Sequence, residues 1–410
     1  MYGIVLQGGG TKGSYHIGVW KALRELGIEI GAVTGTSIGA LNGAFIAQNR
    51  FDQALEVWEN IKVNDVLDAD QEVYKDFMTL DINLDKADQY FAYFRRVVQD
   101  KGLDIAPLRK LIETHLDETV LRASDIDFGL VTVSLTDMKP LELFVEDIPK
   151  GKLTDYLLAS SFLPGFKAQE LDGKRFLDGG MYDNLPINLI AQKGYKDIIA
   201  VEMDSMGLKQ KVRAEDLNIT RISPSGDVGM MLQFDPELAK RNIQMGYLDT
   251  MKTFGKYEGM NYFFETLPDE DVFLNSILEI KDDDIIEMAK DLGIYEGNPK
   301  RILFEKLVPE MADIFNLDLK DGYREIFITM IEYLGQELGI ERLKVYDFRA
   351  FEELVFEKVI ERSSKFSIYK ELPTFLKKSS IVKFTLKEEI VVHWAQILTD
   401  SYMDFKAVQN

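Results

Sequence analysis

Gly35-Thr36-Ser37-Ile38-Gly39 is the stretch of sequence that decides the fold of this chain. It follows a strand predicted at residues 30–34 and precedes a run rich in small residues, which indicates a strand, a sharp turn and a helix. In such a turn the positions two before and two after the serine approach closely, and only glycine fits there without a side-chain clash. The turn exposes the serine hydroxyl at a helix N-terminus, where negative charge is stabilised. Ser37 is therefore the predicted nucleophile, with Gly35 and Gly39 completing the nucleophile elbow.

A second glycine-rich turn lies near the N-terminus, after a strand predicted at residues 2–7. It reads Gly8-Gly9-Gly10-Thr11-Lys12-Gly13 and leads into a helix predicted at residues 14–26. Consecutive residues without a Cβ let backbone amides point outward into an anion-binding nest, and the helix adds its positive end. Beside a nucleophile, such amides form an oxyanion hole, which stabilises the charge that grows on a carbonyl oxygen during acyl transfer. Residues 8–13 are the predicted oxyanion hole.

Dinucleotide binding is the other chemistry that this loop could serve, since Gly8-x-Gly10-x-x-Gly13 matches the Rossmann fingerprint. That fingerprint needs an acidic residue at the end of the second strand, to hold the ribose hydroxyls. Here the second strand runs into Ser37, and the nearest acid, Glu29, stands at its beginning. The position of the acid therefore disfavours a dinucleotide site.

A serine hydroxyl needs a base to take its proton, and the chain has three histidines, His16, His115 and His393. His16 lies in the first predicted helix and is expected to point away from the site or to pack. His115 and His393 occupy polar helical contexts and are interpreted as surface or boundary residues. A standard α/β-hydrolase also places its elbow after several strands, whereas this elbow comes with the second. The standard histidine triad is therefore not expected.

A carboxylate is the alternative base. Asp178 ends a predicted strand just before Gly179-Gly180, which would let the backbone turn sharply and leave the carboxylate facing a partner. In a partly dry pocket an aspartate can serve as general base, with a pKa that desolvation tunes. Taken alone, Asp-Gly-Gly is also a common turn, so these residues by themselves leave both interpretations open.

Composition limits the partners and the compartment. The chain has 410 residues, a net charge of −21 and a pI near 4.7, so it should be repelled by nucleic acid and by strongly anionic bilayers. It has no cysteine, which excludes disulfides, thiolate zinc sites and a cysteine nucleophile. Without a signal peptide or an apolar run long enough to span a bilayer, a cytoplasmic location is expected, with peripheral contact to a membrane left open.

Strands and helices alternate over the first part of the chain, with glycine at strand ends. This pattern predicts an α/β fold with a largely parallel central sheet over residues 1–265. Further elements are expected: a hairpin of strands at 128–134 and 141–145, a strand at 198–203 and a helix at 235–253. After Pro268, amphipathic helical patterns replace the strand patterns. Residues 266–410 are therefore expected to form an acidic helical domain, with the boundary near residues 262–270.

Two segments have competing interpretations. Residues 52–117 look helical and polar, and they either shape a substrate channel or form a helical layer over the sheet, the second being favoured. Their aromatic side chains include Tyr90, Phe91, Tyr93 and Phe94. Residues 229–234, Gly-Met-Met-Leu-Gln-Phe, are either an interfacial patch for lipid or a segment buried against the helical domain, and burial is again favoured.

Together the motifs resemble those of the patatin-like phospholipase family. That family has a glycine-rich oxyanion loop with a basic residue, which Lys12 matches, then G-x-S-x-G, then a D-G-G whose aspartate pairs with the serine. Residues 159–166, Ala-Ser-Ser-Phe-Leu-Pro-Gly-Phe, match a further stretch, A-S-x-x-x-P-x-F, shortly before that aspartate. Gln7 stands where many members have aspartate. The resemblance covers residues 1–260, and the agreement in order and spacing makes it specific.

The resemblance implies a three-layer α/β/α sandwich and a dyad of Ser37 and Asp178 that works without a metal or cofactor. Ser37 would attack an ester carbonyl and Asp178 would accept its proton. Amides around Gly9 and Gly10 would hold the oxyanion, and water would release the acyl-enzyme. Lys12 would orient the loop, meet a lipid phosphate or face solvent. A hydrolase of lipids or other esters is the leading interpretation, an acyltransferase with the same dyad the nearest alternative, and a non-catalytic interaction protein a distant one.

Overall fold

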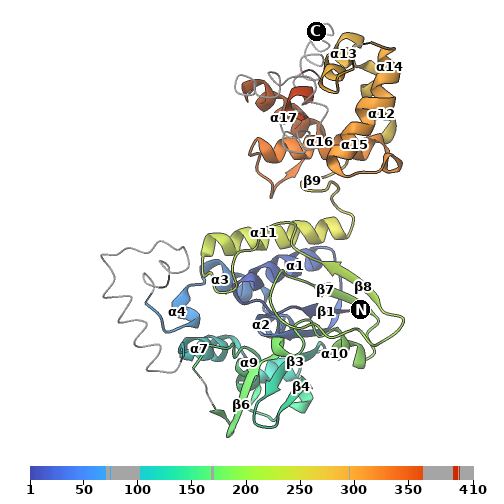
Figure 1. Cartoon of the computed structure of the whole chain (residues 1–410). Coiled ribbons are helices and arrows are strands. Elements are labelled where there is room, and N and C mark those ends of the chain that lie inside the picture. The colour runs from blue at the N-terminus through green and yellow to red at the C-terminus, as the bar shows by residue number, and fades with distance from the viewer. Residues whose placement is uncertain are drawn as a thin grey trace. The chain divides into compact units, whose positions relative to one another are not determined.

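The computed structural model divides into two compact units, residues 1–254 and residues 255–410 (Figure 1). The described residues are 1–70, 74, 102–167, 170–294, 296–362, 391–395 and 397. The sequence placed the boundary near residues 262–270, but Tyr262 and Phe264 already pack in the core of the second unit. The second unit therefore begins several residues before the predicted range, at Gly255.

A mainly parallel sheet forms the centre of the first unit. Its strands are β1 (Tyr2–Leu6), β2 (Ile30–Thr36), β3 (Asp127–Ser134), β4 (Lys139–Phe144), β5 (Glu170–Leu171), β6 (Lys174–Asp178), β7 (Asp197–Val201) and β8 (Asn218–Ile222). They lie in the order β5-β6-β3-β2-β1-β7-β8, with β4 also paired to β3. β1, β2, β3, β7 and β8 are parallel, whereas β4 and β6 run antiparallel to β3. The predicted α/β fold and the β3–β4 hairpin are confirmed.

Helices cover both faces of this sheet. They include α1 (Ser14–Glu25), α2 (Ile38–Ala47), α3 (Phe51–Asn60), α4 (Val63–Val66), α7 (Ala106–His115), α8 (Glu118–Arg122), α9 (Leu153–Ser160), α10 (Ile187–Gln192) and α11 (Pro236–Thr253). Gly43 of α2 lies against Val33 of β2, while Ile190 of α10 shares a buried cluster with Ala32 of the same strand. Neighbouring strand residues point to opposite faces, so α2 and α10 belong to different layers. The unit is a three-layer α/β/α sandwich.

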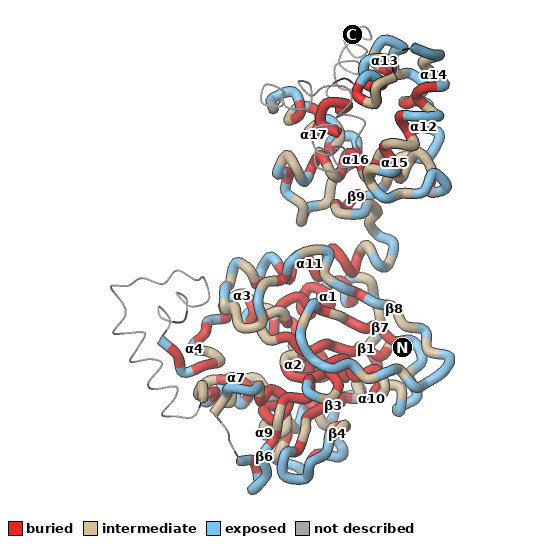
Figure 2. The backbone as a smooth tube through the Cα atoms, in the orientation of Figure 1, coloured by how far each residue is buried: buried red, intermediate tan, exposed pale blue. Residues whose placement is uncertain are grey.

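The helix after the glycine loop, α1, packs directly against α11. A Cβ on Gly18 of α1 would lie 1.9 Å from the carbonyl oxygen of Ile243, and a Cβ on Gly246 of α11 would lie 2.2 Å from that of Tyr15. The two backbones are therefore in direct contact, which only glycine allows at these positions. Asp235 caps α11 by accepting from the amides of Glu237 and Leu238, so the helix predicted at residues 235–253 is confirmed. Within the first unit, Figure 2 shows the buried residues concentrated in the sheet and on the helices packed against it.

The second unit is helical, as predicted. Its helices include α12 (Glu270–Glu279), α13 (Asp282–Asp291), α14 (Pro299–Ile302), α15 (Val308–Phe315), α16 (Gly322–Glu337) and α17 (Phe348–Arg362). A short parallel pair, β9 (Phe263–Phe264) with β10 (Val345–Tyr346), accompanies them. None of the helices in the described parts of the chain has both the length and the apolar character that crossing a bilayer requires.

His393 lies in the core of this second unit. Its Nδ1 is 2.7 Å from Oδ2 of Asp291, and the indole Nε1 of Trp394 donates to the same oxygen at 3.1 Å. Both Asp291 and His393 are buried. The interpretation of His393 as a surface or boundary residue is therefore wrong, because a carboxylate far away in the sequence provides the partner that lets it be buried.

Candidate active site

Ser37 lies in a sharp turn between β2 and α2, with φ 56° and ψ −124°. A positive φ is uncommon for a residue with a side chain and persists only where the surroundings enforce it. A Cβ on Gly35 would lie 2.3 Å from the backbone carbonyl carbon of Gly39, and a Cβ on Gly39 would lie 2.1 Å from the carbonyl oxygen of Leu6. The close approach expected of the elbow is present, and both positions require glycine.

A second serine holds the amide of the elbow. Ser160, at the end of α9, accepts a hydrogen bond from the N–H of Ser37 at 2.9 Å and donates to the carbonyl oxygen of Val131 in β3 at 2.6 Å. Ser160 is fully buried, so these bonds are shielded from competition with water. The 159–166 motif contained this residue, but no local pattern indicated its contact with Ser37.

The glycine loop lies directly against Ser37. β1 and β2 are adjacent and parallel, so the loops after them meet at one edge of the sheet. A Cβ on Gly8 would lie 3.2 Å from the Cβ of Ser37. Gly10 has φ 59°, and a Cβ there would lie 2.0 Å from the carbonyl oxygen of Met231. The structure thus brings the predicted oxyanion loop and the elbow together.

Two amides of this loop remain available to a ligand. The N–H of Gly8 donates to the carbonyl oxygen of Asn184 at 3.1 Å, and the N–H of Thr11 donates to that of Met231 at 2.7 Å. Within the described part of the chain, the amides of Gly9 and Gly10 donate no hydrogen bond. Of the predicted residues 8–13, Gly9 and Gly10 therefore have amides that donate to no described residue.

The loop after β7 anchors both ends of the glycine loop. Oε1 of Gln7 accepts from the N–H of Met203 at 2.6 Å, and Nζ of Lys12 donates to the carbonyl oxygen of Asp204. Of the three roles considered for Lys12, this contact supports the one that orients the loop.

Strands β2 and β6 meet end to end along one edge of β3. β2 runs parallel to β3 and ends with Thr36 opposite Val131. β6 runs antiparallel and ends with Asp178 opposite Thr132. β4 occupies the other edge of β3 over both positions, so the carboxyl ends of β2 and β6 face each other. Because Ser37 follows Thr36 directly, this register places it beside Asp178.

The carboxylate of Asp178 is almost fully buried, with 3% of the residue exposed. Its Oδ1 accepts from the N–H of Gly180 at 2.7 Å. Burial raises the pKa of Asp178 from 3.8 to about 6, although the Gly180 amide and the Ser37 hydroxyl both favour the charged form and oppose that shift. Its Oδ2 is buried and accepts no hydrogen bond from any described residue. The site therefore holds a carboxylate with a free lone pair and a raised proton affinity beside a serine hydroxyl.

His16 and His115 are not paired with Ser37 among the described contacts. Nδ1 of His16 lies 3.1 Å from Nδ2 of Asn42, and burial lowers the pKa of His16 to about 3, so it packs, as expected. His115 is half-buried, as a boundary residue should be. Its ring centroid lies 5.8 Å from that of Phe45, and both residues line a pocket that also includes Ser37.

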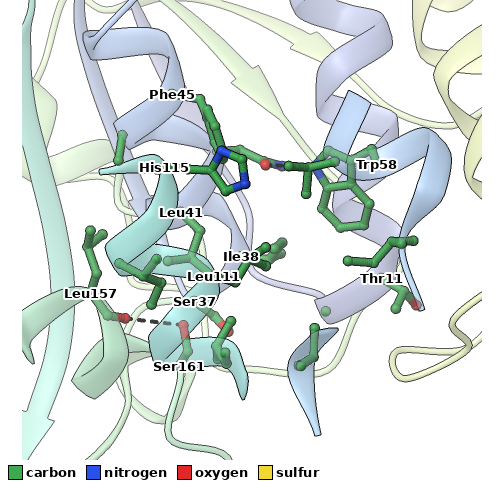
Figure 3. A pocket seen from close by; sticks show the side chains of 18 of the residues that line it. Thr11, Ser37, Ile38, Leu41, Phe45, Trp58, Leu111, His115, Leu157 and Ser161 are labelled. Carbon is green, nitrogen blue, oxygen red and sulfur yellow. Dashed lines mark hydrogen bonds between the residues drawn. The ribbon is translucent and has the colours of Figure 1, made fainter. Parts of the chain in front are cut away.

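This pocket is apolar, and Ser37 is one of the residues that line it (Figure 3). Its empty space, including the open solvent at its mouth, is about 910 Å³. Residues along one side of α2 form a wall that begins at Ser37 and continues through Ile38, Leu41, Phe45 and Gln48. No lysine, arginine, aspartate or glutamate is among the described residues that line it. The pocket therefore suits a hydrocarbon chain attached to a group that reacts at Ser37.

Residues 52–117 contribute another wall of this pocket. Trp58 from α3, Val66 from α4, and Leu108 and Ile112 from α7 all line it. The favoured interpretation, a helical layer alone, is therefore incomplete, since the described part of this segment also lines the pocket. Tyr90, Phe91, Tyr93 and Phe94 lie outside the described residues.

Residues 229–234 lie against the glycine loop. The hydroxyl of Thr11 donates to the carbonyl oxygens of Met230 and Met231 at 2.9 Å and 3.1 Å. Leu232 and Phe234 line the pocket, while Met230 is 50% exposed. This run packs against the first unit, where Thr11 binds two of its carbonyls, and its burial against the helical domain stays a prediction. Peripheral membrane contact stays a prediction.

The segment after Asp178 connects the elbow and the glycine loop. The hydroxyl of Thr36 donates to the carbonyl oxygen of Asp183 at 2.7 Å, and Asn184 binds Gly8 through its backbone and its side chain. Asp183 is fully buried, and burial raises its pKa to about 6. Sequence reasoning did not identify either residue, because their partners lie more than a hundred residues away.

Comparison with known proteins finds similarity to one family. Residues 4–191 match the family model described as patatin-like phospholipase. Patatin-like phospholipase domain-containing protein 6 of Mus musculus is 25% identical over 339 residues, covering 78% of this chain and 22% of that protein. A patatin-like phospholipase domain-containing protein of Caenorhabditis elegans, ZK370.4, is 30% identical over 208 residues, covering 50% of this chain and 14% of that protein.

A third relative is named lysophospholipase NTE1, from Mycosarcoma maydis. It is 27% identical over 205 residues, covering 50% of this chain and 10% of that protein. The chain thus spans about a fifth or less of the length of these three relatives. The region that matches the family model includes the elbow, the glycine loop and Asp178. Residues 4–191 of this chain are therefore similar to the patatin-like phospholipase family.

Proposed function

We propose that this protein hydrolyses a carboxylic ester of a lipid, with Ser37 as nucleophile and Asp178 as general base. The observation that supports this most directly is the end-to-end meeting of β2 and β6, which sets a buried carboxylate of raised pKa beside the elbow serine. A carboxylate in that position can accept the hydroxyl proton when the serine attacks.

In the first step, Oγ of Ser37 bonds to the ester carbonyl carbon and its proton passes to the carboxylate of Asp178. The carbonyl oxygen becomes an oxyanion, which the amides of Gly9 and Gly10 stabilise. The intermediate then collapses, the bond to the leaving alcohol breaks, and the alcohol takes the proton from Asp178. Water repeats the sequence on the acyl-enzyme and releases the fatty acid.

The proposed acyl site is the apolar pocket along α2. From Ser37 to Phe45 the helix rises by about 12 Å, at 1.5 Å per residue. An extended chain advances roughly 1.25 Å per carbon, as tetrahedral geometry with bonds of about 1.5 Å requires. About ten carbons therefore extend from Ser37 to the level of Phe45 and His115, whose rings lie together and line the pocket. We propose an acyl chain of about this length as the preferred one.

Narrowing the pocket midway should shorten the acyl chain that the protein accepts. Leu41 lies on α2 between Ser37 and Phe45 and lines the pocket. In Leu41→Trp, activity on a decanoyl ester should fall about 10- to 100-fold, because several methylenes lose their site and each is worth about 1 kcal/mol or more. Activity on the matching butyryl ester should stay within about twofold. The ratio of kcat/KM for the two esters is the measurement.

Leu55→Trp is the matched control for this variant. Leu55 is half-buried on α3 and is not among the described residues that line the pocket. Its substitution should leave the decanoyl-to-butyryl ratio unchanged. An equal loss on both esters in Leu41→Trp would mean that the acyl chain lies elsewhere.

Product analysis with a lysophospholipid tests the proposed function itself. The protein should release free fatty acid from decanoyl lysophosphatidylcholine, and free acid should remain the main acyl product when glycerol is added. Accumulation of acylglycerol would instead identify an acyltransferase that uses the same serine. Absence of turnover together with no labelling of Ser37 by a fluorophosphonate would leave an interaction protein.

A further inference from the structure

The carbonyl group of Gly8 is the acceptor for two side chains from different loops. Nδ2 of Asn184 donates to it at 3.2 Å and Oγ of Ser205 donates to it at 2.5 Å. The N–H of Gly8 in turn donates to the carbonyl oxygen of Asn184 at 3.1 Å. Both polar backbone groups of this glycine are therefore fixed by residues outside the glycine loop.

Fixing the Gly8 carbonyl also fixes the amide of Gly9. A peptide group is planar and trans, so the C=O of one residue and the N–H of the next point in opposite directions, and the described chain has no cis peptide. The Gly9 N–H therefore points away from Asn184 and Ser205. Between two glycines such a plane is otherwise free to rotate, because no Cβ restricts it.

Asn184 is itself held in place. It is 2% exposed, and its Nδ2 also lies 3.0 Å from the carbonyl oxygen of Met206. Its N–H donates to the carbonyl oxygen of Leu208 at 2.6 Å. The Asn184 Oδ1 atom lies 2.3 Å from the position that a Cβ on Gly8 would take, and 3.0 Å from the position that a Cβ on Gly180 would take. The carboxamide thus lies between the glycine loop and the turn that follows Asp178.

We infer that Asn184 and Ser205 are positioning residues of the oxyanion hole, which hold the Gly8–Gly9 peptide plane so that the Gly9 amide faces the reacting carbonyl. This inference rests on the proposed function. A plane turned by half a rotation would aim the Gly8 carbonyl oxygen at the oxyanion and replace an attraction with a repulsion. The two donors remove that alternative before substrate binds, which is the preorganisation that an oxyanion hole requires.

Removing these donors should lower kcat without changing KM. In Ser205→Ala, kcat for a decanoyl ester should fall about 10-fold, and in Asn184→Ala about 100-fold, since complete loss of one oxyanion donor costs about 10²- to 10³-fold. The rate at which a fluorophosphonate labels Ser37 should fall in parallel, because that reaction also places negative charge on an oxygen. KM should stay within about twofold, since the acyl pocket is untouched.

Asn188→Ala is the matched control. Asn188 also holds two backbone groups, the carbonyl oxygen of Lys211 at 3.0 Å and the N–H of Arg213 at 2.9 Å, but it contacts neither the glycine loop nor the elbow among the described contacts. Its kcat and labelling rate should match those of wild type. Melting temperatures of all variants are compared, and Ser205→Ala, which removes one half-buried hydroxyl, serves as the deciding variant if Asn184→Ala does not fold.

Wild-type kcat and labelling rate in a folded Ser205→Ala protein would overturn the inference and leave the proposed function intact. A rise in KM that accounts for the whole loss of kcat/KM would also overturn it, since that result would indicate a role in substrate binding. If wild type neither turns over the ester nor reacts with the fluorophosphonate, the proposed function fails, and the inference fails with it.

Discussion

Ser37→Ala should lower kcat for lipid esters by about 10⁴-fold or more, because removal of an attacking serine eliminates the covalent route and leaves only binding and the oxyanion hole. Labelling by a fluorophosphonate should disappear at the same time. Release of fatty acid, measured over long incubations, checks the first result, and mass spectrometry of the intact protein checks the second. Activity within tenfold of wild type would show that another group is the nucleophile.

Ser37→Gly provides a second inactive variant with a different stability. Alanine retains a Cβ, so Ser37→Ala keeps the strain of φ 56° and its melting temperature should match that of wild type. Glycine adopts positive φ without that strain. Ser37→Gly should therefore be more stable by about 1 kcal/mol, because the relief of a strain of roughly 1–3 kcal/mol is partly offset by the larger entropy that glycine gives the unfolded chain. Equal melting temperatures for the two variants would mean that the elbow is not strained.

Asp178→Asn should lower kcat by about 10³-fold while making the folded protein more stable at neutral pH. The loss follows from removing the base, since general acid–base catalysis is worth about 10²- to 10⁴-fold. The wild-type rate should fall as pH drops through about 6, the raised pKa of Asp178, because only the ionised carboxylate accepts the serine proton. The pH dependence of acylation by a reactive ester measures that midpoint.

The gain in stability follows from the same shift in pKa. Burial raises the pKa of Asp178 in the folded state from 3.8 to about 6. Between these values the folded protein binds more protons at this group than the unfolded chain, so the contribution of Asp178 to stability is fully present below pH 3.8 and is lost as pH rises through about 6. Above that pH the ionised carboxylate destabilises the fold by about 1–3 kcal/mol.

Asparagine cannot ionise, so the stability difference between Asp178→Asn and wild type should grow across this pH window and stay constant above it. Urea unfolding of both proteins from pH 4 to pH 8 measures the difference. Using the difference also removes the contribution of Asp183, whose pKa burial likewise raises to about 6. A variant that is less stable than wild type at pH 8 would contradict the buried, charged state of Asp178.

The parts of the site that sequence reasoning reached are those that depend on local sterics. Gly35 and Gly39 must be glycine because the chain passes within 2.3 Å of where a Cβ would be, and such a demand is visible in five consecutive residues. The parallel sheet could be predicted as well, because strand and helix periodicity is also a local pattern in the sequence. The position of Asp178 depends on how β6 pairs with β3, which a local pattern does not contain, so its role came only from the family resemblance.

The contacts that sequence reasoning missed join residues far apart in the chain. Ser160 binds the Ser37 amide, and Asn184 and Ser205 bind Gly8, but a serine or asparagine in a loop gives no indication of its partner. His393 was misjudged in the same way, because Asp291, which lets it be buried, lies on another helix. The channel walls from α3 and α7 looked polar in sequence, since only one side of each helix faces the pocket.

The end-to-end strands along β3 fix the spacing of Ser37 and Asp178 in whole residue steps. Val131 and Thr132 are consecutive, and a strand advances about 3.3 Å per residue. An inserted residue at that point of β3 would widen the gap by one full step and also turn every later side chain to the other face. Mutations in β3 therefore cannot change this spacing in small steps, whereas the loops around it can vary freely. New substrate preferences should arise from changes in the residues that surround the site, while the spacing between Ser37 and Asp178 stays the same.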